Sequence, residues 1–209
     1  MVSLWWAEAE KFGVLPLDDR ETERAFDWFK SNAPTRYEYL PGMARADRLM
    51  IPATNERNFR ICAQLESVTQ DTRGVVLACG NRFGGYILYC AAGMVVFDYV
   101  YTETKSYSLR ASIAPGSMAV EIAFEKTGEK SGRFTLKCNG VVSDTGDVPR
   151  TWSTYGVTAG LTCGYANVPF NDQCIPPSTF NSTIQLVVVE FDPGTAPQDE
   201  RFKAILQEE

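Results

Sequence analysis

The sequence predicts an all-β protein, an antiparallel two-sheet β-sandwich or jelly roll with a short helix near each end. Three observations lead to this prediction. Apolar runs broken by glycines recur between Arg73 and Tyr101, alternating apolar and polar residues follow Pro115-Gly116, and turn signals separate about ten to twelve short segments. A chain of 209 residues is long enough for one such domain with helical flanks.

The segment from Arg73 to Tyr101 is the predicted centre of the sandwich. Its three runs are rich in Val, Ile, Leu, Phe and Tyr and are separated by glycine-bearing breaks, a pattern typical of consecutive antiparallel strands joined by tight turns. The glycines of the first break allow a positive φ or a close approach of the backbone. Arg82 and Phe83, which lie between these glycines, are therefore expected to point outward.

A period of two residues predicts the remaining strands. Met118, Val120, Ile122 and Phe124 share one face while Glu121 and Glu125 share the other, as in an antiparallel strand with one wet face. Asn139-Gly140 is a strong type I′ turn signal and predicts a hairpin. Strands are expected at 48–51, 58–65, 73–101 (three strands), 118–124, 134–138, 141–142, near 155–161 and at 181–191. An arrangement of this kind is concanavalin-like.

The two ends of the chain predict helices. Residues 4–12 and 18–29 contain helix formers with apolar spacings of three and four, and 199–206 repeat this pattern. We therefore divide the chain into a helical connector (1–36), which is expected to continue from an upstream segment, a β-sandwich domain (37–192) and a C-terminal tail with a short helix (193–209). Trp5, Trp6 and Phe12 give the first helix an exposed apolar face and are the candidate interdomain contacts.

Composition excludes several functional classes. The sequence has no histidine, which removes the usual general base and the usual nitrogen ligand of zinc. A net charge of -6 offers no basic surface for nucleic acid. The longest apolar run, 74–80, is far shorter than the roughly 20 residues of a membrane span. With no secretory signal in the sequence, a cytoplasmic protein without membrane contact is expected.

The six cysteines predict no metal site, because none forms a C-x-x-C pair. Four lie in apolar strand-like runs and are expected to be small buried hydrophobes: Cys62, Cys79, Cys90 and Cys138. Cys163 and Cys174 bracket a loop, and whether they form a disulfide stays open. Oxygen ligands of the kind that calcium accepts are available at Asp144, Asp147, Asn167, Asn171 and Asp172, although turn-forming roles are favoured for these residues.

Strand tyrosines supply the candidate binding surface. Aromatic rings on one face of a sandwich form a platform for sugar rings or for a protein surface, whereas the alternative is that tyrosine simply favours half-buried strand faces. Five tyrosines belong to this set: Tyr86, Tyr89, Tyr99, Tyr101 and Tyr107. The candidate binding residues are Asn81, Arg82, Tyr86, Tyr89, Tyr99 and Tyr101.

Several segments resemble the lectin-like C-terminal domain of arylsulfatases, which belong to the sulfatase family. The resemblance covers nearly the whole chain, and its most specific part is the Gly-Asn-Arg-Phe-Gly-Gly-Tyr-x-Leu-Tyr block at 80–89. It also includes the leader at 4–20, Tyr39-Leu40-Pro41-Gly42 and Phe180-Asn181-Ser182-Thr183-Ile184. The chain departs from the family at Thr162-Cys163-Gly164, where an aspartate-glycine pair is expected.

The resemblance implies a function without catalysis in this chain. The parent enzyme would hydrolyse sulfate esters with a formylglycine and a divalent metal, calcium, in the absent domain. Residues 174–178 lack the serine and arginine of the formylglycine signature at the required positions, so no catalytic residue and no cofactor are assigned to this chain. The predicted role is an accessory domain that packs on the upstream catalytic domain and shapes substrate access or self-association.

Two other functional classes compete with this hypothesis. The alternative is a free-standing carbohydrate-binding, lectin-like module that uses the tyrosines and Arg82. A glycosidase of lectin-like fold would need paired carboxylates. Glu121 and Glu125 have the right parity on one strand but no third acid beside them, so a solvated strand face is the preferred interpretation.

Overall fold

The structure is a computed structural model that describes residues 2–14, 34–46, 50–52, 54, 57–152, 159–172, 174 and 178–192. The chain divides into two units, one of residues 1–33 with 199–209 and one of residues 34–198. In the first unit the described element is α1 (Val2–Lys11), which Gly13 follows at a φ of 66°, as is usual for a glycine after a helix. The second unit contains all the described strands.

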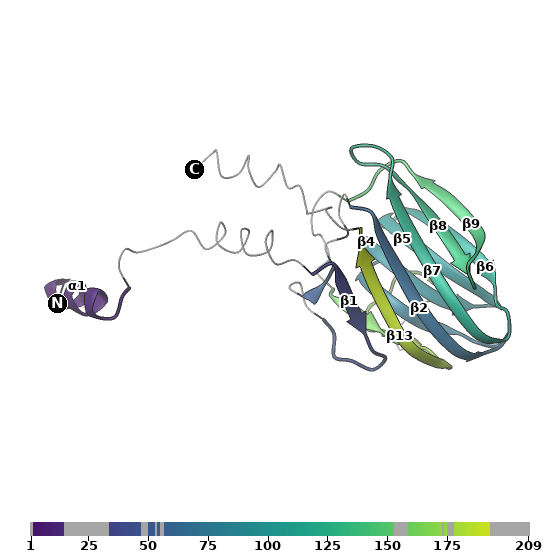
Figure 1. Ribbon diagram of the computed structural model, residues 1–209, viewed down its shortest axis with the longest axis horizontal. Helices are drawn as coiled ribbons and strands as arrows, with labels where there is room; N and C mark the ends of the chain where they lie inside the picture. The colour runs from purple at the N-terminus through teal and green to yellow at the C-terminus, as the bar shows by residue number, and fades with distance from the viewer. Residues whose placement is uncertain are drawn as a thin grey trace. The chain divides into compact units, whose positions relative to one another are not determined.

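Two sheets form the second unit (Figure 1). Sheet A has six strands in the order β1 (Arg36–Tyr39), β13 (Thr183–Phe191), β2 (Phe59–Val68), β7 (Gly116–Lys126), β8 (Gly132–Cys138) and β9 (Val141–Val148). Sheet B has seven strands. Six of them follow the order β11 (Tyr165–Ala166), β12 (Ser178–Thr179), β3 (Gly74–Asn81), β4 (Gly84–Ala91), β5 (Met94–Thr102) and β6 (Lys105–Ser112). The seventh strand, β10 (Leu161–Cys163), also pairs with β3. The pairings are antiparallel except for that of β12 with β3.

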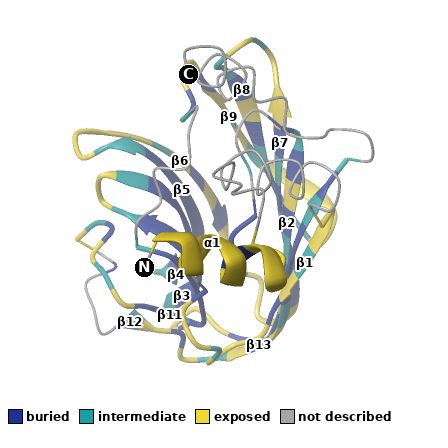
Figure 2. Cartoon of the chain, turned by 90° about the vertical axis from the view of Figure 1, so that its left-hand side faces the viewer, coloured by how far each residue is buried: buried dark blue, intermediate teal, exposed yellow. Residues whose placement is uncertain are grey.

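The core lies between the sheets, and Figure 2 shows the two layers of strands with their buried residues in dark blue. Sheet A faces the core with every second residue. On β7 the four apolar residues predicted to share a face are buried, and Phe59, Ile61, Ala63 and Leu65 of β2 are buried likewise. Aromatic rings fill one end of the core, where the centroid of Phe134 lies 4.7 Å from that of Phe124 and 5.0 Å from that of Phe97.

Sheet B is covered on both of its faces. Strands β3, β4 and β5 are buried at nearly every position, because a second apolar cluster lies on the side away from sheet A. Residues 164–172, which we call the strap, contribute Ala166, Val168 and Phe170 to this cluster, and Cys174 joins them. Val75, Ile87 and Val96 lie beneath them on the strands. Continuous apolar runs therefore belong to the sheet that is covered on both sides.

These findings confirm the predicted fold class. The central meander, the strand after Pro115-Gly116 and the hairpin at Asn139-Gly140 are all present. The prediction omitted β1, β6, β11 and β12. The serines and charged residues of β6 hide its alternation. The predicted helices at 18–29 and 199–206 lie outside the described residues, as does most of the strand expected near 155–161. The domain boundaries stay a prediction.

The six cysteines are free thiols in this structure. Cys163 belongs to the core between the sheets and Cys174 to the cluster on the outer side of sheet B, so the disulfide that the sequence left open does not form. Cys79 and Cys90 are buried as predicted, whereas Cys62 and Cys138 are only half-buried. Among the described helices, none is long and apolar enough to cross a membrane.

Candidate functional site

The candidate tyrosines do not form an exposed platform. Tyr86 and Tyr99 are buried in the core between the sheets, because their positions alternate toward sheet A. Tyr89 points to the other side of sheet B and is buried under the strap. Tyr101 and Tyr107 are half-buried against the core. A sugar ring therefore cannot stack on Tyr86, Tyr89 or Tyr99 in this structure, and strand preference explains these residues better.

Asn81 and Arg82 lie in the turn of the β3–β4 hairpin, where they meet the turn of the β5–β6 hairpin. Arg82 Nη2 donates a hydrogen bond to Glu103 Oε1 at 2.6 Å, across the two turns. The Phe83 side chain is 57% exposed, and the guanidinium carbon of Arg82 lies 5.3 Å from the centroid of its ring. We call Asn81, Arg82, Phe83 and Glu103 the hairpin-tip site.

Local backbone chemistry sets the geometry of the hairpin-tip site. Asn81 Oδ1 accepts a hydrogen bond from the backbone N–H of Phe83 at 2.9 Å, which closes the turn with the asparagine side chain. Gly80 and Gly85 have φ values of 101° and 138°, and a Cβ on either one would lie 2.2 Å or less from a carbonyl oxygen of the paired strand. Glycine is therefore required at both positions.

An indole ring supports the base of the same hairpin. A Cβ on Gly84 would lie 2.7 Å from the ring of Trp152, so the backbone packs directly on the indole. The Trp152 indole N–H donates to the Val100 carbonyl at 3.3 Å, and its ring centroid lies 5.7 Å from that of Tyr101. Of the candidate tyrosines, Tyr101 is thus the one that adjoins the hairpin-tip site.

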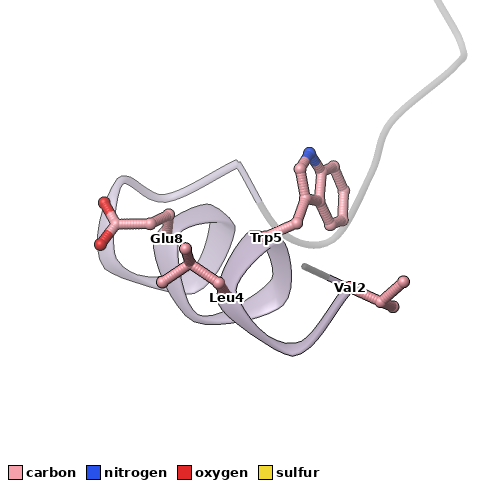
Figure 3. Close-up of a pocket in the computed structure, with 4 residues that line it drawn as sticks. All are labelled: Val2, Leu4, Trp5 and Glu8. Carbon is pink, nitrogen blue, oxygen red and sulfur yellow. The ribbon is translucent and has the colours of Figure 1, made fainter.

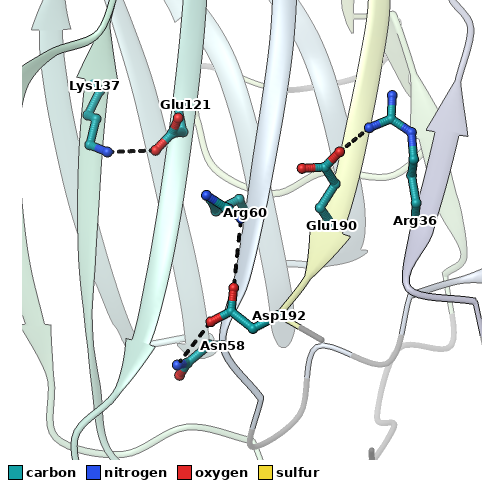
Figure 4. A network of polar contacts seen from close by, with 7 residues as sticks. All are labelled: Arg36, Asn58, Arg60, Glu121, Lys137, Glu190 and Asp192. Atoms are coloured by element: carbon teal, nitrogen blue, oxygen red, sulfur yellow. Dashed lines mark hydrogen bonds and ion pairs between the residues drawn. The ribbon is translucent and has the colours of Figure 1, made fainter. Parts of the chain in front are cut away.

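The outer face of sheet A is a second polar surface, and we call it the charged face. Figure 4 shows three ion pairs that join neighbouring strands: Arg36 with Glu190, Arg60 with Asp192 at 3.8 Å, and Lys137 with Glu121 at 2.8 Å. A further pair joins Arg133 to Asp147 at 2.7 Å. Small side chains lie between these pairs at Cys62, Ala119 and Ala123, by the alternation and register of β2 and β7. Among the residues that the structure describes, no exposed aromatic ring lies on this surface.

Two of the acids that raised other functional hypotheses, Glu121 and Asp147, form ion pairs on this surface. Glu121 accepts from Lys137, and Asp147 accepts two hydrogen bonds from the Arg133 guanidinium at 2.7 and 3.0 Å, which lowers the pKa of its carboxyl group. Asp144 Oδ2 accepts the backbone N–H of Arg110 at 2.9 Å and so ties β9 to the edge of sheet B. Within the described ranges, no three or more of His, Cys, Asp and Glu are placed to hold a metal ion.

A buried carboxylate lies on the outer side of sheet B. Asp98 is 6% exposed and accepts hydrogen bonds from Ser108 Oγ at 2.6 Å, Asn171 Nδ2 at 2.7 Å and Tyr89 Oη at 3.1 Å. Among the residues that the structure describes, no arginine or lysine forms an ion pair with it. Three neutral donors therefore compensate the burial of this charge. Burial, and then the negative charge of Asp98, raise the pKa of Tyr89.

Helix α1 carries the predicted interdomain contacts. Trp5 and Trp6 are about half exposed, Phe12 is more exposed, and the two indole centroids lie 4.8 Å apart with their planes nearly perpendicular. An open hollow on this helix is lined, among the described residues, by Val2, Leu4, Trp5 and Glu8 (Figure 3). The prediction that these residues contact another domain stays untested.

Comparisons with known proteins bear on the fold. No protein-family model matches the sequence, and no curated protein matches it. The CBM40 module of the Ruminococcus gnavus IT-sialidase, bound to α2,6-sialyllactose, is similar in structure with a TM-score of 0.54 and 18% identity over 82% of this chain and 96% of that one. A second structure of the same module gives a TM-score of 0.53 and 19% identity over the same shares of the two chains.

A weaker likeness connects the chain with a toxin domain. The binding domain of botulinum neurotoxin DC in complex with SialylT gives a TM-score of 0.45 and 12% identity over 75% of this chain and 37% of that one, and we base no argument on it. At these identities the two CBM40 structures show that this chain has a CBM40-like β-sandwich fold, and no more than the fold.

The comparisons correct the resemblance to arylsulfatases, and with it the predicted accessory role. The two structures with the higher TM-scores are sialidase carbohydrate-binding modules rather than sulfatase C-terminal domains. The glycine block that carried the resemblance has a local cause, because the turn geometry at Gly80 and Gly85 admits only glycine. These two glycines are required by the local hairpin geometry, so their presence is weak evidence of common origin.

Proposed function

We propose that this chain is a carbohydrate-binding, lectin-like module and that it binds glycans at the hairpin-tip site. The observation that carries the proposal is the exposed ring of Phe83 beside the Arg82–Glu103 ion pair, on a sandwich of CBM40-like fold. This was the alternative hypothesis from the sequence, now centred on different aromatic residues.

The hairpin-tip site offers the two kinds of contact that a sugar needs. The apolar face of a pyranose ring can stack on the exposed Phe83 ring. Sugar hydroxyl groups both donate and accept hydrogen bonds, and the guanidinium of Arg82 and the carboxylate of Glu103 offer charged partners of each type. Because the ion pair already fixes these two side chains, little conformational entropy is lost when a ligand binds.

A glycan array followed by calorimetric titration tests the proposal. The first probe is α2,6-sialyllactose, the ligand in the R. gnavus structure, with lactose as the matched neutral sugar. We expect saturable binding of at least one glycan by the natural chain. Phe83→Ala and Arg82→Ala are each expected to weaken this binding about tenfold or more, which corresponds to roughly 1.4 kcal/mol.

Two variants on the opposite sheet are matched controls. Val142→Ala truncates an apolar side chain of similar exposure (55%) just beyond another hairpin turn, and Arg133→Ala removes an equally exposed, ion-paired arginine. Both are expected to bind as the natural chain does.

If no neutral or acidic glycan binds, the proposed function is wrong. If Arg60→Ala and Lys137→Ala abolish binding while Phe83→Ala does not, the ligand binds the charged face instead.

A further inference from the structure

The strap connects the buried Asp98 to the hairpin-tip site. The Pro169 carbonyl accepts a hydrogen bond from the backbone N–H of Arg82 at 3.1 Å. Two residues further along the strap, Asn171 Nδ2 donates to Asp98 Oδ2 at 2.7 Å. The carbonyl that holds the Arg82 backbone is therefore fixed, through two residues of chain, to a carboxylate on β5.

Other contacts make the strap stiff at this point. Asn171 Oδ1 accepts the backbone N–H of Cys174 at 3.0 Å, so the oxygen and nitrogen of the amide are both used and its orientation is defined. Phe170, the residue between Pro169 and Asn171, is 5% exposed and packs in the outer cluster of sheet B. The strap is thus held by packing at Phe170 and by a charge-assisted hydrogen bond at Asn171.

Asp98 also holds the other half of the hairpin-tip site. Its Oδ1 accepts from Ser108 Oγ at 2.6 Å, and Ser108 lies on β6, the strand that follows the turn containing Glu103. One carboxylate therefore connects to both hairpin turns, to Arg82 through the strap and to Glu103 through β6. A carboxylate that is so little exposed needs all of its hydrogen-bond donors. Removing one donor therefore loosens the segment that carries this donor.

We propose that Asp98 and Asn171 are positioning residues, which fix the backbone of Arg82 and thereby place the Arg82 and Phe83 side chains for the ligand. This inference rests on the proposed function for its ligand, whereas the positioning itself concerns the hydrogen bond between Arg82 and Pro169 and is measurable without a ligand. Neither residue contacts the ligand. Each acts through the strap.

Amide hydrogen exchange by NMR tests the positioning directly. In the natural chain we expect the Arg82 amide to be protected by the Pro169 carbonyl. In Asn171→Ala this amide should exchange at least tenfold faster, while the Ile87 and Phe97 amides in the neighbouring strands keep their rates. The affinity for the best glycan of the array should fall about tenfold, with the circular dichroism spectrum unchanged.

A matched control and an exchange of the two side chains complete the test. Asn181→Ala also removes an asparagine that bridges a loop, since Asn181 Oδ1 accepts the Arg73 N–H at 2.7 Å at the other end of β3, and it should leave Arg82 and glycan affinity unchanged. The double variant Asp98→Asn with Asn171→Asp restores one donor and one acceptor between the two positions and should recover at least part of the Arg82 protection.

The outcomes separate this inference from the proposed function. If the natural chain binds a glycan and Asn171→Ala keeps both the Arg82 protection and the affinity, the positioning role is refuted and the proposed function stands. If no glycan binds, the proposed function fails, and the exchange rate of Arg82 in Asn171→Ala still decides whether the strap positions the turn.

Discussion

The two sheets differ in what lies on their outer faces. On sheet A many of the outward residues are charged or small, and ion pairs between solvent-exposed side chains connect neighbouring strands (Figure 4). On sheet B the strap and Cys174 cover the outward residues of β3, β4 and β5, and the one carboxylate among these strands is buried. Polar groups on sheet A are thus paired with each other in water, whereas those of sheet B hold covering segments in place.

The covered sheet and the open sheet differ in how firmly they can hold the proposed site. Polar side chains on a solvent-exposed sheet face need no particular protein partner, because water forms hydrogen bonds with the groups that the ion pairs do not satisfy. A covered face needs every polar group paired, and its hydrogen bonds therefore fix geometry. The hairpin-tip site lies at the end of the covered sheet, where the strap, β4 and β6 all reach it.

The largest expected contrast between the faces is in stability. Phe170→Ala removes a buried ring from the outer cluster of sheet B and should lower the free energy of unfolding by about 3 kcal/mol or more, measured by urea denaturation at constant m-value. Gln64→Ala, at an exposed outward position of β2, is the matched change on sheet A and should cost less than about 1 kcal/mol. Equal costs would mean that the strap does not cover sheet B in solution.

The second prediction concerns the stability of the core between the sheets at high pH, where Tyr99 lies. Burial raises the pKa of Tyr99 to about 12, and its hydroxyl oxygen accepts the backbone N–H of Trp152 at 2.9 Å. The folded chain holds the Tyr99 hydroxyl proton more tightly than the unfolded chain does. The contribution of this group to the free energy of unfolding is therefore complete below pH 10 and is lost as the pH rises from 10 toward 12. Stability should fall in that window by an amount on the order of 2 kcal/mol for this residue.

Urea denaturation at pH 9, 10, 11 and 12 measures this loss. Tyr99→Phe is less stable at neutral pH but should lose less stability than the natural chain between pH 10 and 12. Tyr89 and the buried thiols also have raised pKa values, so some pH dependence will persist in the variant. The same slope in both proteins would show that Tyr99 ionises in the folded state as easily as in water.

The same contrast explains what the sequence could and could not predict. Alternation on β2 and β7 predicted both the strands and their buried residues, because one face of sheet A is wet. The continuous apolar runs of β3 to β5 predicted strands equally well. Because both faces of these strands are buried, however, the runs do not show which side chains face sheet A and which face the outer side of sheet B. The tyrosines were therefore assigned to an exposed face, whereas Tyr86 and Tyr99 face the core between the sheets and Tyr89 lies under the strap.

The hairpin-tip site was predictable only in part. The glycine break predicted that Arg82 and Phe83 point outward, and Phe83 is indeed exposed, while Arg82 was already a candidate binding residue. Glu103 lies 21 residues from Arg82 in sequence, and no local pattern connects the two before the strands pair. Asp98 was hidden for a similar reason, since its donors come from β4, β6 and the strap.

A smaller effect is expected where one donor of Asp98 is removed without leaving a cavity. Tyr89→Phe keeps the ring but deletes the hydroxyl that donates to Asp98 Oδ2, so the free energy of unfolding should fall by about 1 kcal/mol. Tyr165→Phe is the control, because its hydroxyl donates to the Met43 carbonyl at 3.2 Å, a neutral acceptor. A larger cost for Tyr165→Phe would contradict the view that the buried charge makes its donors important.

The smallest expected effect concerns an ion pair of the charged face. The guanidinium of Arg133 lowers the pKa of the Asp147 carboxyl group through two hydrogen bonds, so whatever stability this pair contributes is present above the ordinary pKa of 3.8 and is lost as the pH falls below it. In Arg133→Ala the pKa of Asp147, followed by NMR of its carboxyl carbon, should rise toward that ordinary value. The urea midpoint at pH 7 should hardly change, because both side chains are more than half exposed and water replaces the lost partner. A clear drop in the midpoint would show that the charged face holds sheet A together as the buried carboxylate holds the strap.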